Sequence, residues 1–236
     1  MNKYNLDEKM ERVKEILNDI VEIKETEVLP SRKKFTFNNG FYARVISIFV
    51  DIRDSTKLFT SKRKTSIAKI IRAFTSETIE ILRKSHMLRE IGVRGDCVYA
   101  IYATESFETD YEVVKKAFCI NEFIKKLNKL LQKKGMKNIV VGIGISTGKD
   151  LVIRSGKKSN GLKDLVWIGE TVTLASKFSS IANKNGNRPI IMSAATHNNF
   201  LNIYNKKHQN HSIKKEFEEI NSCYGRCYGC ESLEIN

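Results

Sequence analysis

The sequence predicts an α+β fold: a ferredoxin-like, split βαβ core with an antiparallel sheet, helices on one face of that sheet, and an additional N-terminal helix. Two observations support this prediction. Between residues 44 and 148, segments with strand and helix patterns follow one another in the order strand, helix, strand, strand, helix, strand. Both helical segments carry apolar residues along one face only, which is typical of helices that cover a sheet.

Each element in the first half of the core has its own signal. Residues 44–52 (RVISIFVDI) are rich in β-branched residues and predict a buried strand. Residues 64–84 place isoleucines and a phenylalanine on one helical face. Residues 87–93 and 96–103 lie on either side of a tight turn at Arg94-Gly95, so we expect them to form a hairpin.

The second half follows the same logic. Residues 110–134 repeat apolar positions every three or four residues and end at Gly135, which predicts a second long helix. Residues 138–148 predict a further strand, and residues 150–156 its hairpin partner. A turn into a helix is expected over residues 167–186, and strands are expected in the remainder, beginning with PIIMSA.

The N-terminal segment, residues 1–30, is set apart from a single domain that we place at residues 36–236. A helix is expected over residues 5–27, and Pro30 ends it. Its narrow apolar stripe consists of Leu6, Met10, Val13, Leu17 and Ile20. A stripe of this kind is typical of a helix–helix seam, so the helix either supports a dimer or covers its own domain.

Composition limits the classes of protein that fit. The 236 residues include 41 Lys and Arg against 27 Asp and Glu, for a net charge of +14, which suits a phosphate-bearing partner. No uncharged apolar run approaches the roughly 20 residues that span a bilayer, and the N-terminus is charged throughout. We therefore expect a cytoplasmic protein with no membrane partner. Because no strand carries the aromatic residues typical of RNA-binding sheets, we also expect no nucleic-acid partner.

Three cysteines near the C-terminus, Cys223, Cys227 and Cys230, have a C-x3-C-x2-C spacing. Such a spacing can bind a metal. The repeated Cys-Tyr-Gly unit and the lack of a convincing fourth ligand favour a terminal pair of strands instead.

Two aspartates stand where chemistry is expected. Asp51 ends the first strand, and Asp96 lies at or beside the hairpin turn. In a split βαβ core the first strand neighbours the hairpin, so the two carboxylates should lie side by side, where they repel each other unless a cation lies between them. Taken singly, Asp51 could be a helix cap and Asp96 a turn residue. The joint placement favours a divalent metal site.

The residues after Asp51 could bind phosphate through the main-chain N–H groups that a strand-to-helix turn exposes. Lys57 and Lys62 add positive charge nearby. The substrate-binding residues expected in this stretch are Asp54, Ser55 and Thr56.

Four segments together point to a family. The stretch FVDIRDSTKLF has the pattern F-x-D-I-x-x-x-T, and RGDCVYAIY, VGIGISTG and WIGETVTLASKFSSIA follow it along the chain. In this order, over about residues 44–182, they resemble the motifs of class III nucleotidyl cyclase catalytic domains. The resemblance implies a homodimer with active sites at the interface, in which a nucleoside triphosphate becomes a 3′,5′-cyclic monophosphate. It also implies two Mg²⁺ or Mn²⁺ ions held by Asp51 and Asp96, with the main-chain carbonyl of Ile52 assisting.

The sequence departs from this family at the positions that read the base. Gly92 stands where purine cyclases carry the adenine-reading lysine, and Val166 stands where they carry its partner aspartate. Thr173 replaces the ribose-orienting asparagine, and Lys177 replaces the transition-state arginine. Lysine keeps the positive charge but lacks the planar fork of arginine.

Two further residues are candidates for contact with the base. Arg94 is a candidate substrate-binding residue because it lies close to Asp96 in sequence, although a hairpin arginine often faces solvent. Trp167 either lines the base pocket or packs at the interface, and packing is slightly favoured.

These departures most resemble the pyrimidine cyclases of bacterial Pycsar antiphage systems. The resemblance implies conversion of CTP or UTP to cyclic CMP or cyclic UMP, a second messenger for antiviral defence that a separate effector protein would sense. Two alternatives remain: a conventional adenylate or guanylate cyclase, and a degenerate, non-catalytic cyclase-like domain.

Overall fold

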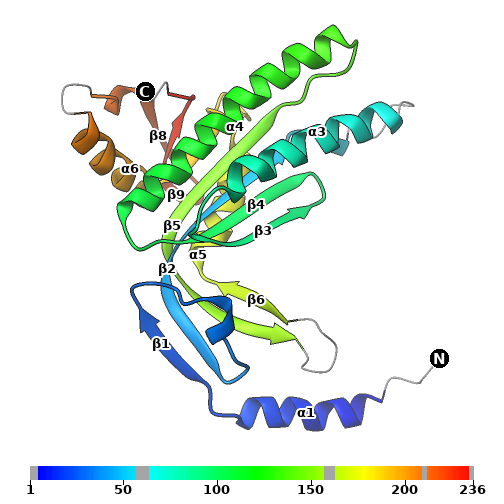
Figure 1. Cartoon of the computed structure of the whole chain (residues 1–236), viewed down its shortest axis with the longest axis vertical. Helices are drawn as coiled ribbons and strands as arrows, with labels where there is room; N and C mark the ends of the chain where they lie inside the picture. The colour runs from blue at the N-terminus through cyan, green and yellow to red at the C-terminus, as the bar shows by residue number, and fades with distance from the viewer. Residues whose placement is uncertain (1–4, 57–63, 157–162, 209–211, 234–236) are drawn as a thin grey trace.

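The computed structural model contains one sheet whose main path has the order β3-β4-β2-β5-β7-β9-β8 (Figure 1). It describes residues 5–56, 64–156, 163–208 and 212–233. Along the path the strands are β3 (Leu88–Arg94), β4 (Cys97–Ala103), β2 (Asn39–Ile52), β5 (Val141–Gly156), β7 (Ile190–Ser193), β9 (Gly225–Cys230) and β8 (Phe217–Ser222). Off the path, β1 (Glu22–Thr26) pairs in parallel with β2, and β6 (Lys163–Ile168) pairs antiparallel with β5.

The helices lie on both faces of this sheet, except for the N-terminal helix, which lies beyond one end of it (Figure 1). They are α1 (Leu6–Asn18), α3 (Lys64–Arg83), α4 (Phe107–Lys133), α5 (Glu170–Ile181) and α6 (Ala194–Lys207), with short 3₁₀ turns at Arg32–Lys34 and Lys214–Glu216. The two long helices α3 and α4 share one face, as predicted, and α5 lies on the opposite face.

The central strand β2 explains the core. It lies between β4 and β5 and is antiparallel to both, which is the neighbour order of a split βαβ unit. Its alternate residues Ile46, Ile48 and Val50 are fully buried in the large cluster that also contains the apolar residues of α3 and α4. The predicted α+β class and core topology are confirmed.

Helix α5 approaches the sheet closely because of a glycine in β5. A Cβ atom at Gly144 would overlap the main-chain oxygen of Ala175 and the main-chain nitrogen of Ser179. On this face a small separate hydrophobic cluster packs between α5 and the sheet. It consists of Phe178, Ala182, Ile191 and Cys227. The glycines of the VGIGISTG segment thus serve helix–sheet packing rather than turns.

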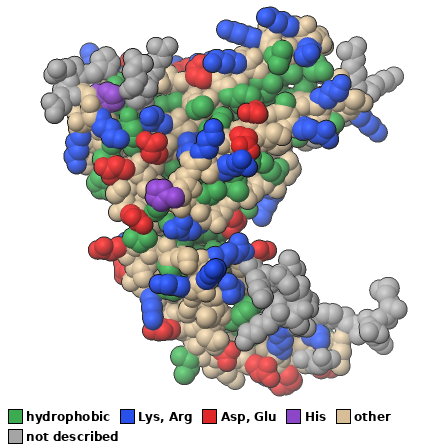
Figure 2. Space-filling view, viewed as in Figure 1, with side chains coloured by type: hydrophobic (Ala, Val, Ile, Leu, Met, Phe, Trp, Pro, Cys, Tyr) green, Lys and Arg blue, Asp and Glu red, His purple; other side chains and the backbone are tan. Residues whose placement is uncertain are grey.

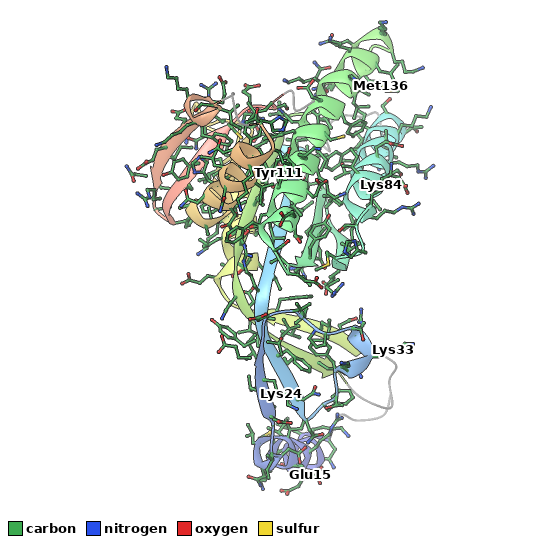
Figure 3. All side chains as sticks on the ribbon, turned by 60° about the vertical axis from the view of Figure 1, so that its left-hand side comes forward. Glu15, Lys24, Lys33, Lys84, Tyr111 and Met136 are labelled. Carbon is green, nitrogen blue, oxygen red and sulfur yellow. The ribbon has the colours of Figure 1, made fainter. Side chains whose placement is uncertain are left out.

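Strands β2 and β5 run on from the main body into a second, smaller lobe (Figure 1). There β2 pairs with β1, and the end of β5 pairs with β6. Figure 3 shows Lys24 and Lys33 in this lobe, with Glu15 on helix α1 beyond it. The lobe is therefore an extension of the same sheet.

Two sequence predictions about strands are wrong. Residues 150–156 do not turn back on residues 138–148 but continue them as one strand, β5, whose hairpin partner is β6. Gly148, which ends the first of these segments, lies within the continuous strand and makes room for a neighbour: a Cβ there would stand 2.7 Å from the hydroxyl of Thr171. The second wrong prediction is that only strands follow PIIMSA, because Ala194–Lys207 form helix α6. The several asparagines of this segment have low helix propensity.

The N-terminal helix is shorter than predicted. It ends at Asn18, and residues 22–26 form β1 instead, where the β-branched residues favour a strand. The apolar stripe of α1 remains exposed: Leu17 is 78% exposed and Leu6 is 62% exposed. Coverage of its own domain is thus not what the helix does in the described residues, and a role in dimer support stays a prediction.

The C-terminal cysteines belong to a strand pair, β8–β9, as the sequence favoured. Cys227 is buried in the cluster on the α5 side, whereas Cys230 is buried in the main core on the other side. Over the parts of the chain that the structure describes, no group of three His, Cys, Asp or Glu side chains is placed to hold a metal.

Lys and Arg side chains are spread over the visible face of the molecule among acidic ones (Figure 2). In the described ranges, no helix combines the length and apolarity required to cross a membrane.

Candidate active site

The two aspartates predicted as metal ligands lie next to each other. In the pairing of β2 with β4, Asp51 is opposite Cys97, so Asp96 is one residue before that partner. The hairpin turn consists of Gly95 and Asp96 rather than Arg94 and Gly95. Gly95 has a φ of +62°, which its position in so tight a turn requires.

Arg53 balances the charge of Asp51. Its guanidinium donates to the carboxylate of Asp51 and, at 2.7 Å, to the main-chain oxygen of Ser180. Burial raises the pKa of Asp51, Arg53 opposes that rise, and the nearby charge of Asp96 adds to it. Burial and Asp96 thus disfavour the negative charge of Asp51, and a cation in addition to Arg53 would stabilise that charge further.

Asp96 carries the clearest sign of a cation ligand. Its Oδ2 atom is buried and has no hydrogen-bond partner among the described residues. Buried polar atoms without partners are rare, and carboxylate oxygens are the ligands that Mg²⁺ and similar ions prefer. The residues present therefore fit a divalent ion shared by Asp51 and Asp96, with substrate phosphates supplying further oxygen ligands.

Cys97, between the two carboxylates, is not a nucleophile. Burial and the neighbouring charge of Asp51 raise the pKa of its thiol to about 12. The thiol stays protonated near neutral pH, where only a thiolate would react.

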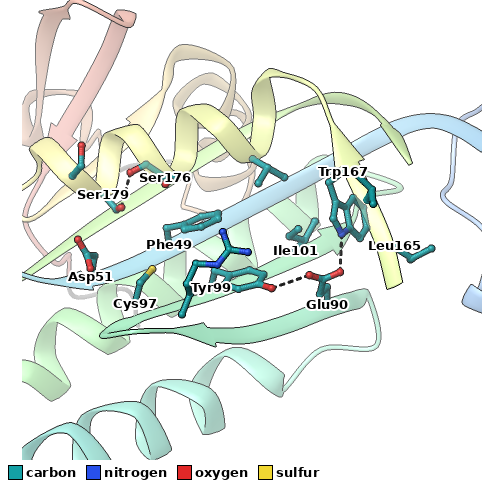
Figure 4. A pocket seen from close by; sticks show the side chains of 14 residues that line it. Phe49, Asp51, Glu90, Cys97, Tyr99, Ile101, Leu165, Trp167, Ser176 and Ser179 are labelled. Carbon is teal, nitrogen blue, oxygen red and sulfur yellow. Dashed lines mark hydrogen bonds between the residues drawn. The ribbon is translucent and has the colours of Figure 1, made fainter. Parts of the chain in front are cut away.

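A pocket of about 500 Å³ extends from Asp51 along the sheet, below α5 and β6 (Figure 4). Its floor contains Phe49 and Tyr99, whose rings stack with centroids 5.3 Å apart. At the end away from Asp51, Glu90 accepts a hydrogen bond of 2.9 Å from the Tyr99 hydroxyl and one of 2.8 Å from the indole N–H of Trp167. The pocket thus joins an acidic end to an aromatic end that has its own carboxylate.

The base-reading positions predicted from the sequence lie at this aromatic end. A Cβ atom at Gly92 would stand 2.7 Å from the ring of Tyr99, so the aromatic ring fills the space of the missing side chain. Val166 and Arg94 line the pocket. Trp167 lines it too, and is therefore more than a packing residue.

Thr173 and Lys177 do not reach this pocket. Both are exposed, one turn apart on α5. The residues of that helix that line the pocket are Val172, Ser176, Ser179 and Ser180. The hydroxyl of Thr173 donates to the main-chain oxygen of Gly169 at 3.2 Å. Asp51, a predicted metal ligand, thus lines the pocket, whereas the predicted catalytic residues Thr173 and Lys177 do not.

The predicted phosphate cradle follows β2 directly. β2 ends at Ile52, a turn follows, and Ser55 and Thr56 have helical backbone. Asp54 has a φ of +53°, which aspartate tolerates better than most residues. The basic neighbours proposed from the sequence, Lys57 and Lys62, lie outside the described residues.

Sequence reasoning missed the roles of Glu90, Tyr99 and Arg53. A signal for Glu90 was present: residues 90, 92 and 94 alternate along β3, so a pocket position at Gly92 implies that Glu90 and Arg94 face the same way. The pairing of Arg53 with Asp51 is local, since the two are two residues apart, and the alternation of side chains along an extended segment could have indicated it.

Comparison with known proteins agrees with this geometry. The family described as "Adenylate and Guanylate cyclase catalytic domain" matches residues 38–222. A uridylate cyclase of Treponema porcinum is 46% identical over 204 residues, which cover 86% of this chain and 71% of that protein. A uridylate cyclase of Gulbenkiania mobilis is 35% identical over 189 residues, covering 77% of this chain and 73% of that protein.

Among solved structures, the adenylyl cyclase CyaB of P. aeruginosa has a similar fold. Its TM-score is 0.65 at 18% identity, and the match covers 83% of this chain and 97% of that one. At this identity the likeness concerns the fold alone.

Proposed function

The chain belongs to the family of adenylate and guanylate cyclase catalytic domains, and we propose that it is a pyrimidine nucleotide cyclase that converts UTP to 3′,5′-cyclic UMP and pyrophosphate. The observation that carries this proposal is the 46% identity to a uridylate cyclase, over a chain that keeps both metal aspartates. Membership of the family confirms the sequence-based prediction of a class III nucleotidyl cyclase.

The predicted metal site lies at the end of the pocket that contains Asp51. Asp51 and Asp96 would hold two Mg²⁺ or Mn²⁺ ions, with the main-chain carbonyl of Ile52 assisting. Bound ions of this kind make a hydroxyl group more acidic and neutralise charge on a departing pyrophosphate. Arg53 holds the Asp51 carboxylate in place through the main chain of Ser180 as well as through its own charge.

The aromatic end favours a pyrimidine base. The adenine-reading lysine is absent, because position 92 is a glycine. The Tyr99 ring fills the space above Gly92 and leaves less room for a two-ring purine. A conventional purine cyclase would need another polar side chain in that space.

The exposed position of Thr173 and Lys177 supports a homodimer with composite sites. Since these residues point away from the pocket of their own chain, they would act on a nucleotide whose metals are held by a second copy. The apolar stripe of α1, in which Leu17 is 78% exposed, gives that dimer a further surface.

Mixing two inactive variants tests this arrangement. We expect Asp51→Ala protein and Lys177→Ala protein each to be nearly inactive. After the two are unfolded and refolded together in equal amounts, about a quarter of wild-type activity should return, because half of the dimers are mixed and one of their two sites is intact. If the mixture were as inactive as its components, composite sites would be wrong.

The products test the proposed reaction. Purified protein is incubated with Mn²⁺ and one nucleotide at a time, and the products are identified by mass spectrometry. We expect UTP to give cyclic UMP together with an equal amount of pyrophosphate. Cyclic AMP or cyclic GMP as the main product would overturn the pyrimidine proposal but not the cyclase chemistry. No product from any nucleotide would support a degenerate domain.

A signalling role in antiviral defence, with a separate cyclic-nucleotide-sensing effector, stays a prediction from the resemblance. The cytoplasmic location also stays a prediction.

A further inference from the structure

We propose that Glu90 selects the base of the substrate by accepting a hydrogen bond from the imino N3–H of uracil. This inference rests on the proposed function and deepens it. It assigns base recognition to a residue that lies beside Gly92 and Val166, the two positions whose side chains can no longer read a base.

The position of Glu90 supports this assignment. Glu90 lines the same pocket as Asp51, so a nucleotide in that pocket lies within reach of both ends. It is two residues from Gly92 on β3, where alternate residues face the same side of the sheet. Its indole donor, Trp167, directly follows Val166 on β6. Glu90 thus contacts a neighbour of each base-reading position: Tyr99, which pairs with Gly92, and Trp167, which follows Val166.

The carboxylate of Glu90 is fixed but not saturated. Tyr99 donates to Oε1 at 2.9 Å and Trp167 donates to Oε2 at 2.8 Å, so each oxygen receives one hydrogen bond from a side chain on a strand. A carboxylate has about four acceptor sites, so each oxygen can accept once more. Burial and the hydrogen bond to Glu90 together raise the pKa of Tyr99 to about 12, so the hydroxyl remains a donor. Tyr99 and Trp167 are positioning residues for this acceptor.

An acceptor-only group separates the two pyrimidines. Uracil carries a hydrogen on N3, whereas N3 of cytosine is itself an acceptor. A carboxylate that faces N3 therefore accepts a hydrogen bond from uracil. With cytosine it meets a lone pair and accepts none. A buried polar group left without its partner discriminates strongly between substrates.

The same reasoning separates uracil from the purines. The corresponding ring nitrogen of adenine is an acceptor, so adenine is rejected as cytosine is. Guanine does carry an imino hydrogen, but it has two rings, and Tyr99 occupies the space above Gly92. Together, Glu90 selects the donor and Tyr99 limits the size of the base.

The substitution Glu90→Gln tests the proposal, because an amide places an N–H donor where an acceptor stood. We measure kcat/KM with UTP and with CTP for wild type, for Glu90→Gln and for Glu105→Gln, a matched change at an exposed residue in the loop after β4. We expect the UTP-to-CTP ratio to fall at least about tenfold in Glu90→Gln, as the loss of one hydrogen bond to a charged group implies. The ratio should be unchanged in Glu105→Gln.

A binding measurement separates recognition from catalysis. Calorimetry with 3′-deoxy-UTP, which lacks the hydroxyl that is cyclised, should show affinity reduced by a similar factor in Glu90→Gln, whereas affinity for 3′-deoxy-CTP should not fall. If Glu90→Gln does not fold, Tyr99→Phe replaces it: freeing one oxygen of Glu90 should raise the KM for UTP more than it lowers kcat.

The outcomes are distinguishable from failure of the proposed function. Wild-type protein that makes cyclic UMP, together with a folded Glu90→Gln variant of unchanged UTP-to-CTP ratio, would overturn the role of Glu90 and leave the function standing. Wild-type protein that makes no cyclic pyrimidine would overturn the function. Equal affinity of wild type and Glu90→Gln for 3′-deoxy-UTP would then overturn the role of Glu90 as well.

Discussion

Replacing Asp96 by asparagine is expected to lower kcat at least about 100-fold without lowering the thermal stability of the protein. The loss of activity follows because a metal ligand in such a site contributes several kcal/mol to the reaction. The retained stability follows because Oδ2 of Asp96 accepts no hydrogen bond from any residue that the structure describes, while the charge of Asp96 repels that of Asp51. Cyclisation rates and melting temperatures are measured on the same preparations.

The matched control is Asp19→Asn, since Asp19 is an exposed aspartate just after α1. It should leave both quantities unchanged. Asp51→Asn should also abolish activity. Unlike Asp96→Asn, it should lower the melting temperature, because it removes the charge with which Arg53 pairs. An Asp96→Asn protein that kept full activity would show that the metal assignment is wrong.

Replacing Asp110 by alanine should cost the largest amount of stability, about 3–5 kcal/mol. Asp110 is fully buried and links four elements, because Arg44 on β2, Thr147 on β5 and Asn199 on α6 all donate to its carboxylate, at 2.9, 2.6 and 3.0 Å. Removing it takes this acceptor from Arg44 and Asn199, whereas the hydroxyl of Thr147 keeps its hydrogen bond with Thr196. It also leaves Arg44, largely buried, without its counter-charge. Urea denaturation followed by circular dichroism measures the change in the free energy of unfolding.

Two further variants serve as controls for Asp110→Ala. Asp110→Asn keeps an acceptor oxygen and should cost less than the alanine variant. Glu122→Ala removes an exposed carboxylate that pairs with Lys125, where the expected cost is below about 1 kcal/mol. If Asp110→Ala and Glu122→Ala cost the same, the buried network would contribute no more than a surface ion pair.

The neighbourhood of Asp51 and Asp96 could be predicted because few topologies fit two helices and four core strands in that order. Once β2 is placed beside the hairpin, the ends of those strands must meet. This part of the site depends on strand order, which hydrophobic patterns show well.

The base end of the pocket could not be predicted in the same way. Glu90 and Trp167 are 77 residues apart, and they meet only because β5 continues through Gly148 to pair with β6. The sequence analysis paired residues 138–148 with residues 150–156 instead, and it assigned Trp167 to a turn into a helix. Likewise, Asp110 showed only as the first residue of a predicted helix, because its partners Arg44, Thr147 and Asn199 come from distant parts of the chain.

The measurement that tests the central claim most directly is a competition. The wild-type protein is incubated with Mn²⁺ and an equimolar mixture of ATP, GTP, CTP and UTP, and the cyclic products are counted by mass spectrometry at low conversion, where their ratio equals the ratio of kcat/KM values. We predict that cyclic UMP is the dominant product, with cyclic CMP at least about tenfold lower if Glu90 reads the N3–H group. A mixture dominated by cyclic AMP or cyclic GMP would contradict the assignment of this protein as a pyrimidine cyclase.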